Sequence, residues 1–283
     1  MAKLVWDQLG AKTYETGVKK GVLYLQSGSA QSGYSYPSGV AWNGLTSVSE
    51  SPEGGDANDI YADDIKYLVL RDAESFGGTI EAYTYPDEFA QCDGSAELTT
   101  GVMIGQQNRK TFGFSYVTTL GNDTELNEYG YKIHLIYGAS VSPSERSYET
   151  INDSPEPINF SWEFTTVPVP VSVVGGNYKA TSLLTIDSTK FKTEAEIARL
   201  KNFEDVLYGS DGTATYTEFT GNAFVEGTTY YERSGEEGSY VYTPTSDTTK
   251  SGSKTYYTKS VSGVTTARLP LPEEVVTLLA PST

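Results

Sequence analysis

The sequence predicts an all-β protein with one or two short helices, folded as a β-sandwich or barrel. Its 283 residues include 22 Tyr and 28 Gly, and Tyr, Thr and Val favour strands while Gly favours turns. Strand-like runs alternate with turn residues along the first part of the chain, a pattern typical of sandwiches and barrels. The runs are residues 21–26, 39–51, 64–72, 77–86, 110–120, 129–142 and 158–171.

Two of these runs indicate how their strands are buried. Phe160, Trp162 and Phe164 alternate with polar residues, so they share one face of a strand whose other face is in water. The run "YKIHLIYG", residues 131–138, is apolar at nearly every position. Such a run is typical of a strand that is covered on both faces.

Helix signals are fewer. Thr193 and Glu196 form a T-x-x-E capping box, apolar residues then follow at helical spacing, and Gly209 stands where a terminating glycine belongs. These signals predict a helix over 194–208. A weaker signal at 85–94 predicts one short helical turn between Pro86 and Gly94. The apolar segment "ARLPLPEEVVTLL", residues 267–279, is expected to pack against the helix over 194–208.

Residues 47–63 read "SVSESPEGGDANDIYAD" and are acidic, rich in Gly and without periodicity. The segment predicts a long, exposed and mobile loop. Its carboxylates do not fit the calcium-binding EF-hand pattern, so a solvated loop is the better interpretation. The residues of this loop that we expect to contact a partner are Glu50, Pro52, Glu53, Asp56 and Asp59.

Residues 214–266 differ in style, with abundant Thr, Tyr, Ser and Gly. "GTTYYERS" at 227–234 recurs as "SKTYYTKS" at 253–260, which predicts a small three-stranded β module inserted into the larger domain. The predicted surface of the module is formed by Tyr230, Tyr231, Tyr256 and Tyr257. One tyrosine of each pair is expected to pack on the larger domain and the other to be exposed. Exposed tyrosines suit either a subunit contact or glycan binding.

Charge and rare residues bear on the function class. The chain has 20 Lys and Arg and 37 Asp and Glu, which give a formal charge of −17. This negative charge argues against a surface that binds nucleic-acid phosphates. Cys92 is the sole cysteine and His134 the sole histidine, so neither a disulfide nor a two-histidine metal site is expected. No G-x-S-x-G or P-loop motif is present. We therefore expect no enzyme activity and no cofactor. The sequence also has no signal peptide and no run of eighteen apolar residues, which favours assembly in a cytosol.

Several stretches together resemble the major tail protein, or tail tube protein, of long-tailed phages and prophages of Gram-positive bacteria. The resemblance covers 1–213 and 267–279. In similar proteins the counterpart of "FEDVLYG" (203–209) lies a few residues before that of "RLPLPEEV" (268–275), whereas here the Tyr-rich module separates them. The resemblance therefore divides the chain into a tail-tube β-sandwich domain, 1–213 with 267–283, and an insertion, 214–266. The stretches that carry it are "DQLGAKTYETGVKKGVLY", "AWNGLTSVSESPEGG", "GVMIGQQNRKTFGFSYVT", "YKIHLIYGA", "ATSLLTIDSTK" and "ARLPLPEEVVTLL".

This resemblance implies a structural virion protein that assembles in the host bacterial cytoplasm. Its subunits would form six-membered rings, stacked into a tube through which the genome leaves the capsid. Expected partners are other copies of the chain, a tape measure protein and the tail-tip and terminator proteins. DNA would pass the acidic bore without specific binding, the loop at 47–63 would reach an adjacent ring, and no membrane would be involved. The alternatives are a carbohydrate-binding or host cell-wall adhesion module, motivated by the tyrosines, and an acid-loop hydrolase.

Overall fold

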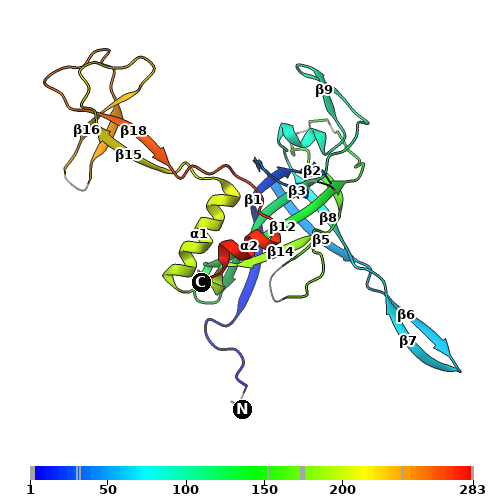
Figure 1. The fold of residues 1–283 in the computed structure, drawn as a ribbon. Helices are drawn as coiled ribbons and strands as arrows, with labels where there is room; N and C mark the ends of the chain where they lie inside the picture. Colours follow the sequence, from blue (N-terminus) through cyan, green and yellow to red (C-terminus); the bar gives the residue numbers. More distant parts are fainter. Residues whose placement is uncertain are drawn as a thin grey trace. The chain divides into compact units, whose positions relative to one another are not determined.

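The computed structural model describes residues 4–29, 31, 33–148, 150–151, 153, 155–172, 176–236 and 239–281. The protein is mostly β with a few short helices, as predicted. Its chain divides into two compact units (Figure 1). The sandwich unit comprises Met1–Tyr208 and Thr266–Thr283, and the Tyr-rich unit comprises Gly209–Thr265.

One antiparallel sheet forms the frame of the sandwich unit. Its strands follow the order β4-β1-β11-β12-β13-β8-β5, and β14 pairs with β12 beside this path. The central strands, β11 and β12, correspond to two apolar runs of the sequence. The bounds are β1 Thr13–Leu25, β4 Gly39–Trp42, β5 Leu45–Glu53, β8 Ser75–Ala82, β11 Phe112–Asn122, β12 Leu126–Val141, β13 Phe160–Thr166 and β14 Leu183–Asp187.

The long strand β12 joins the two halves of this sheet. Its first part pairs with β11 and β14, and its end, from Ala139 to Val141, pairs with β13. Gly138 stands between these parts with φ +63, a conformation that glycine adopts readily. A Cβ at Gly138 would lie 2.2 Å from the carbonyl oxygen of Val167. The change of partner along β12 therefore requires glycine.

Both faces of the β11–β12 pair are covered, as the sequence predicted for the run at 131–138 in β12. The inner face carries an aromatic cluster, which we call the inner core. Trp42 lies 4.5 Å from Phe89 and 5.5 Å from Trp162 between ring centroids, distances at which edge-to-face aromatic packing is favourable. Phe89 belongs to the short 3₁₀ helix η1, Asp87–Gln91, within the predicted helical turn. The inner core comprises Leu23, Trp42, Ile80, Ala82, Phe89, Cys92, Phe112, Phe114, Tyr116, Ile136, Ala139, Val141, Trp162 and Phe164.

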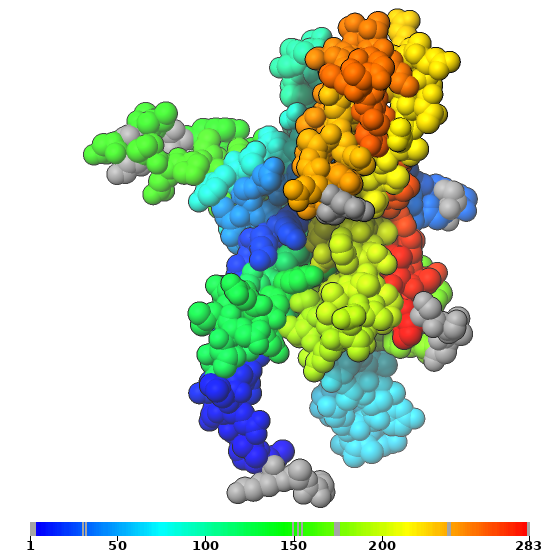
Figure 2. Space-filling view, turned by 90° about the vertical axis from the view of Figure 1, so that its left-hand side faces the viewer, coloured from blue at the N-terminus to red at the C-terminus, as the bar shows by residue number. Residues whose placement is uncertain are grey.

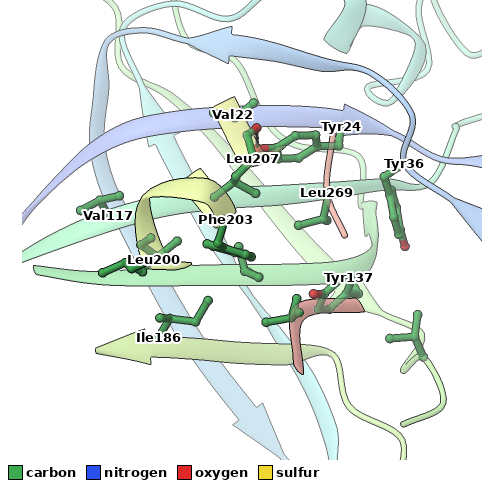
Figure 3. Packing of buried hydrophobic residues seen from close by; sticks show 14 residues of the cluster. Val22, Tyr24, Tyr36, Val117, Tyr137, Ile186, Leu200, Phe203, Leu207 and Leu269 are labelled. Carbon is green, nitrogen blue, oxygen red and sulfur yellow. Dashed lines mark hydrogen bonds between the residues drawn. The ribbon is translucent and has the colours of Figure 1, made fainter. Parts of the chain in front are cut away.

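The opposite face carries the helix-side core, where α1 (Glu194–Tyr208) and α2 (Pro272–Leu279) pack on the sheet (Figure 3). Helix α1 has the predicted range, and its capping box forms: the Thr193 amide donates to the Glu196 carboxylate at 2.9 Å. Tyr24 of β1 donates from its hydroxyl to the carbonyl of Leu207 at 2.8 Å. The C-terminal segment packs beside α1, as predicted, and Leu269 and Val275 join the same core.

Shorter elements complete the sandwich unit. Among the residues that the structure describes, three two-stranded sheets lie outside the main sheet, and a second 3₁₀ helix precedes α1. These elements are β2 Ser27–Ser29 with β3 Gly33–Ser35, β6 Ala57–Ala62 with β7 Ile65–Arg71, β9 Ala96–Thr99 with β10 Val102–Ile104, and η2 Ser188–Lys190.

The prediction that 47–63 is an irregular loop is wrong. Most of the segment lies in β5 and β6, separated only by 54–56. Strand β5 pairs with β8 from Leu45 to Glu53, and β6 pairs with β7. The carboxylates are compatible with strands because each segment has a partner strand to which its backbone bonds. Composition alone does not reveal that partner.

The Tyr-rich unit is a four-stranded sheet rather than the predicted three-stranded one. Its order is β15-β18-β16-β17, with β15 Thr213–Glu218, β16 Tyr230–Ser234, β17 Val241–Pro244 and β18 Tyr256–Ser262. The two repeats pair directly, with Tyr231 opposite Tyr257. The unit begins and ends at neighbouring residues, because Ser210 and Thr265 exchange two backbone hydrogen bonds of 3.0 Å.

We predict that the helix-side core stabilises the sandwich unit through Phe203. Phe203 is fully buried, so Phe203→Ala should lower the free energy of unfolding by about 3–5 kcal/mol. Ile197→Ala is the matched control, because Ile197 lies on the same helix but is exposed, and it should change stability by less than about 0.5 kcal/mol. Tryptophan fluorescence during urea unfolding reports this unit alone, since Trp6, Trp42 and Trp162 all belong to it. Equal effects of the two substitutions would contradict the packing described above.

Candidate interaction surface

The sandwich unit carries a projecting hairpin of β6 and β7, which we call the arm. It continues from β5 and β8 beyond the body of the sheet (Figure 1). Ala62 pairs with Ile65 across a two-residue turn, and both turn residues, Asp63 and Asp64, have positive φ of 52 and 60. Two residues with positive φ define the type I′ turn that suits a tight hairpin. Figure 2 shows the arm in light blue as a separate protrusion from the sandwich.

Large apolar side chains are exposed on both faces of the arm. Every residue of β7 is exposed, and successive strand residues point to opposite faces. The side chains of Tyr61 and Tyr67 retain 67% and 66% of their accessible surface. A two-stranded ribbon without a covering layer is marginally stable in water. The exposed apolar residues of the arm are Ile60, Tyr61, Ile65, Tyr67, Leu68, Val69 and Leu70.

A polar cluster holds the base of the arm on the sandwich. The Tyr116 hydroxyl of β11 donates to the Glu50 carboxylate of β5 at 2.5 Å. The His134 ring of β12 stacks on the Tyr116 ring, with centroids 4.5 Å apart and planes 4° apart. Nδ1 of His134 lies 3.4 Å from Oε1 of Glu50. Three strands therefore meet at Glu50.

The other side of His134 faces a second carboxylate. Its Nε2 lies 3.4 Å from Oε1 of Glu15 and 3.0 Å from the Thr118 hydroxyl. Lys132 binds Glu15 at 2.5 Å. Partial burial raises the pKa of the Glu15 carboxyl, but the bonds from Lys132 and Thr118 outweigh this effect and lower it. The cluster thus places a histidine between two carboxylates at one end of the inner core.

The contact with His134 is the main cause that lowers the pKa of the Glu50 carboxyl, with a further contribution from the Tyr116 hydroxyl and an opposing one from burial. The same carboxylate and, above all, burial raise the pKa of the Tyr116 hydroxyl. The cluster stabilises ionised Glu50 and protonated Tyr116. It acts as a charge-assisted bond between β5 and the central strands.

The residues that the sequence assigned to a contact loop lie along β5, the adjoining turn and β6. Glu50 belongs to the base cluster, whereas Pro52 and Glu53 are exposed near the end of β5. Asp56 lies in the turn that follows β5, and Asp59 of β6 pairs with Lys66 across the arm at 2.7 Å. This exposed ion pair contributes little stability. Sequence analysis did not predict that the apolar residues of β7 form a contact surface, although the apolar run "IKYLVLR" indicates one.

The expected surface of the Tyr-rich unit is wrong in one respect. Tyr230, Tyr256 and Tyr257 are all buried, and they pack on aromatic rings of their own unit rather than dividing into one exposed and one packed residue per pair. The Phe224 ring lies 4.0 Å from Tyr230 and 4.8 Å from Tyr256 between centroids. Tyr231 is half-buried. The unit has an aromatic core of its own, which the prediction of one packed and one exposed tyrosine per pair did not include.

Other candidate chemistry is sparse in the described part of the chain. There, no group of three or more His, Cys, Asp or Glu side chains is arranged to hold a metal ion. Cys92 is buried in the inner core, and burial raises the pKa of its thiol to about 12, so it is a poor nucleophile at neutral pH. Among the same residues, no helix has both the length and the apolar character to span a membrane.

The comparisons with known proteins add no relative: no protein-family model and no curated protein matches this sequence.

We predict that the base cluster makes stability depend on pH. The pKa of Glu50 is lowered in the folded chain, so its contribution is present above the unfolded pKa of about 4.3 and is lost as the pH falls below it. Glu50→Gln should therefore unfold with a shallower loss of stability between about pH 5 and pH 3 than the wild type. Glu53→Gln on the same strand is the control and should keep the wild-type slope. Identical slopes for all three proteins in urea unfolding would exclude this role of the cluster.

Proposed function

We propose that this chain is a structural subunit that self-assembles into stacked rings, forming the tube of a phage tail through which the genome passes. The observation that carries the proposal is the arm, whose apolar residues are exposed on both faces. Exposed apolar patches of this kind mark protein contacts. An unprotected strand edge also promotes pairing with another chain. The resemblance to major tail proteins supplies the identity of the assembly.

A projecting arm favours contact between different surfaces of two copies. Such a contact is heterologous, and it closes into a ring or continues as a filament according to the rotation it imposes. The end strands of the sheet, β4 and β5, offer further edges for contact between neighbours. A tube of stacked rings uses both possibilities, closure within a ring and continuation along the axis.

Charge supports the role of a conduit. A formal charge of −17 repels DNA phosphates, so DNA can slide through an acidic bore without being held. The Tyr-rich unit is proposed to stand on the outer wall, because a module of its size in the bore would obstruct the genome. In this account the chain has no chemistry to perform, and its partners are copies of itself and the proteins that set the length and the ends of the tube.

The carbohydrate-binding alternative loses the main observation that supported it. It rested on exposed tyrosines in the inserted module, yet Tyr230, Tyr256 and Tyr257 are buried. Stacking on a sugar requires an accessible ring face. Tyr240, beside the Arg233 guanidinium at 4.1 Å, is exposed, whereas the other described tyrosines of this unit are buried or half-buried. One exposed ring does not make a glycan platform.

We predict that acidic substitutions on both faces of the arm abolish assembly without unfolding the sandwich. Val69 and Leu70 are consecutive residues of the regularly paired part of β7, so they point to opposite faces. Tyr67→Asp with Val69→Asp and Leu70→Asp should raise the concentration needed for assembly at least about tenfold, the effect of losing about 1.4 kcal/mol per contact. Sedimentation and negative-stain microscopy at rising concentration measure it.

The matched control for the arm variant is Tyr178→Asp, which charges another exposed tyrosine of the same unit and should assemble like the wild type. Tubes or rings formed by the arm variant at wild-type concentration would sink the proposal. Persistent monomers of the wild type at every concentration would do so as well.

We also predict that the Tyr-rich unit is dispensable for assembly. Because Ser210 and Thr265 are hydrogen-bonded neighbours, a short Gly-Ser linker can replace 211–264 at little entropic cost. The shortened chain should unfold at the wild-type urea concentration by tryptophan fluorescence and form tubes of unchanged diameter. A shortened chain that folds but forms no tubes would place the module in a subunit contact instead.

A further inference from the structure

The segment before β1 exposes a second apolar surface. Trp6 and Leu9 retain 74% and 84% of their accessible surface, and Leu4 and Val5 are exposed as well. Figure 2 shows this segment in dark blue, extending from the sandwich. An exposed tryptophan that follows two apolar residues is typical of an anchor that fills a pocket on a partner.

A groove of suitable character lies beside the end strand β4. We call it the β4 groove, with a volume of about 570 Å³, a size within the range of ligand pockets. Strand β4 pairs with β1 on one side, and on its other side the Gly39 amide already donates to the Ala267 carbonyl at 2.8 Å, so the groove is offered to a partner mainly through its side chains. The groove is lined in part by Val18, Lys19, Lys20, Ala41, Trp42 and Leu45.

The groove and the segment are complementary in charge as well as in polarity. Lys19 and Lys20 are exposed at the groove, adjacent cations in a chain of formal charge −17. Asp7 follows Trp6 directly. With the indole in the groove, the Asp7 carboxylate lies near the lysines, and such a pair steers and orients association.

The segment of the same chain is too short to reach the β4 side of the groove. The Gly10 amide donates to Oδ1 of Asp123 at 3.0 Å, which ties residue 10 to the turn between β11 and β12, beside the start of β1. Trp6 lies four residues from Gly10, so its Cα atom can lie at most about 14 Å from that of Gly10. Gly21, which lies opposite Trp42 of β4, is eight residues along β1 from Thr13, about 26 Å away at strand spacing. The β4 side of the groove is therefore left to a segment from elsewhere.

We propose that the segment Leu4–Leu9 of a second copy of this chain occupies the β4 groove, with Trp6 as the anchor and Asp7 beside Lys19 and Lys20. The inference rests on the self-assembly proposed above and names one of its contacts. It gives neighbouring subunits a contact independent of the arm. Each copy both supplies a segment and offers a groove, so the contact extends from copy to copy.

Disulfide trapping between two different chains tests the proposal. One full-length chain carries Gln8→Cys, and a second, enlarged by a tag, carries Asn43→Cys at the groove. Mixed and oxidised, they should form a covalent heterodimer. Pairing Gln8→Cys with Lys190→Cys, an exposed site on η2, should give none. The native Cys92 is buried and takes no part.

Two further outcomes separate this inference from the proposed function. Trp6→Ala should weaken association at least tenfold relative to Tyr178→Ala, an exposed aromatic control. A heterodimer without rings or tubes would refute the tail-tube function and leave the segment contact standing. Tubes formed at wild-type concentration by Trp6→Ala, with no heterodimer, would overturn the contact and leave the function standing. An intrachain disulfide in the Gln8→Cys and Asn43→Cys double variant at low concentration would also overturn it.

Discussion

The pairing of β11 with β12 is the interaction on which the sandwich unit depends. Both faces of this pair are buried, one by the inner core and the other by the helix-side core. Burial on two faces explains why the helices and the C-terminal segment must return to the sheet. Gly113 of β11 shows how close that return is, because a Cβ there would lie 2.4 Å from Leu269. The Tyr-rich unit interrupts this return without taking part in either core.

The same constraint defines where the packed sandwich ends and where the exposed arm begins. The inner core closes at Tyr116, whose hydroxyl binds Glu50 of β5. Up to Glu50, β5 is held by aromatic packing and by the contact of Glu50 with His134, whose ring lies between the Glu50 and Glu15 carboxylates. Beyond it the chain continues as a ribbon with no covering layer. A ribbon that buries little apolar surface gains little free energy to offset its ordering entropy, and we propose that a surface of another copy covers it.

Local sequence signals predict the elements that do not depend on pairing with a strand far along the chain. The capping box at Thr193 and Glu196 located α1, and the apolar run around His134 located a strand covered on both faces. The strand character of 47–63 could not be predicted, because it comes from pairing with β7 and β8 rather than from composition. For the same reason the tyrosine pairs were misplaced. Phe219 and Phe224, far along the chain from Tyr256, provide the rings on which Tyr230 packs.

The contact residues also divide into those that sequence analysis identified and those that it did not. Glu50 and Asp59 were placed in a partner-binding segment from their acidic surroundings, and both lie in the arm or at its base. Tyr116, Glu15 and Thr118 were missed, because no spacing in the sequence indicates that three strands converge on His134. Trp6 directly precedes a stretch that carries the family resemblance, but its exposure is a property of the folded chain. Residues that act through long-range pairing need the structure.

The central claim is that the arm is completed by another copy of the chain, and amide hydrogen exchange on β6 and β7 tests it most directly. Exchange is compared between dilute protein and protein concentrated until it assembles. The account predicts slow exchange at 57–71 only in the concentrated sample, with β11 and β12 protected in both. Fast exchange of the arm within assembled particles would contradict it, since the arm would then be uncovered in the assembly it is proposed to build.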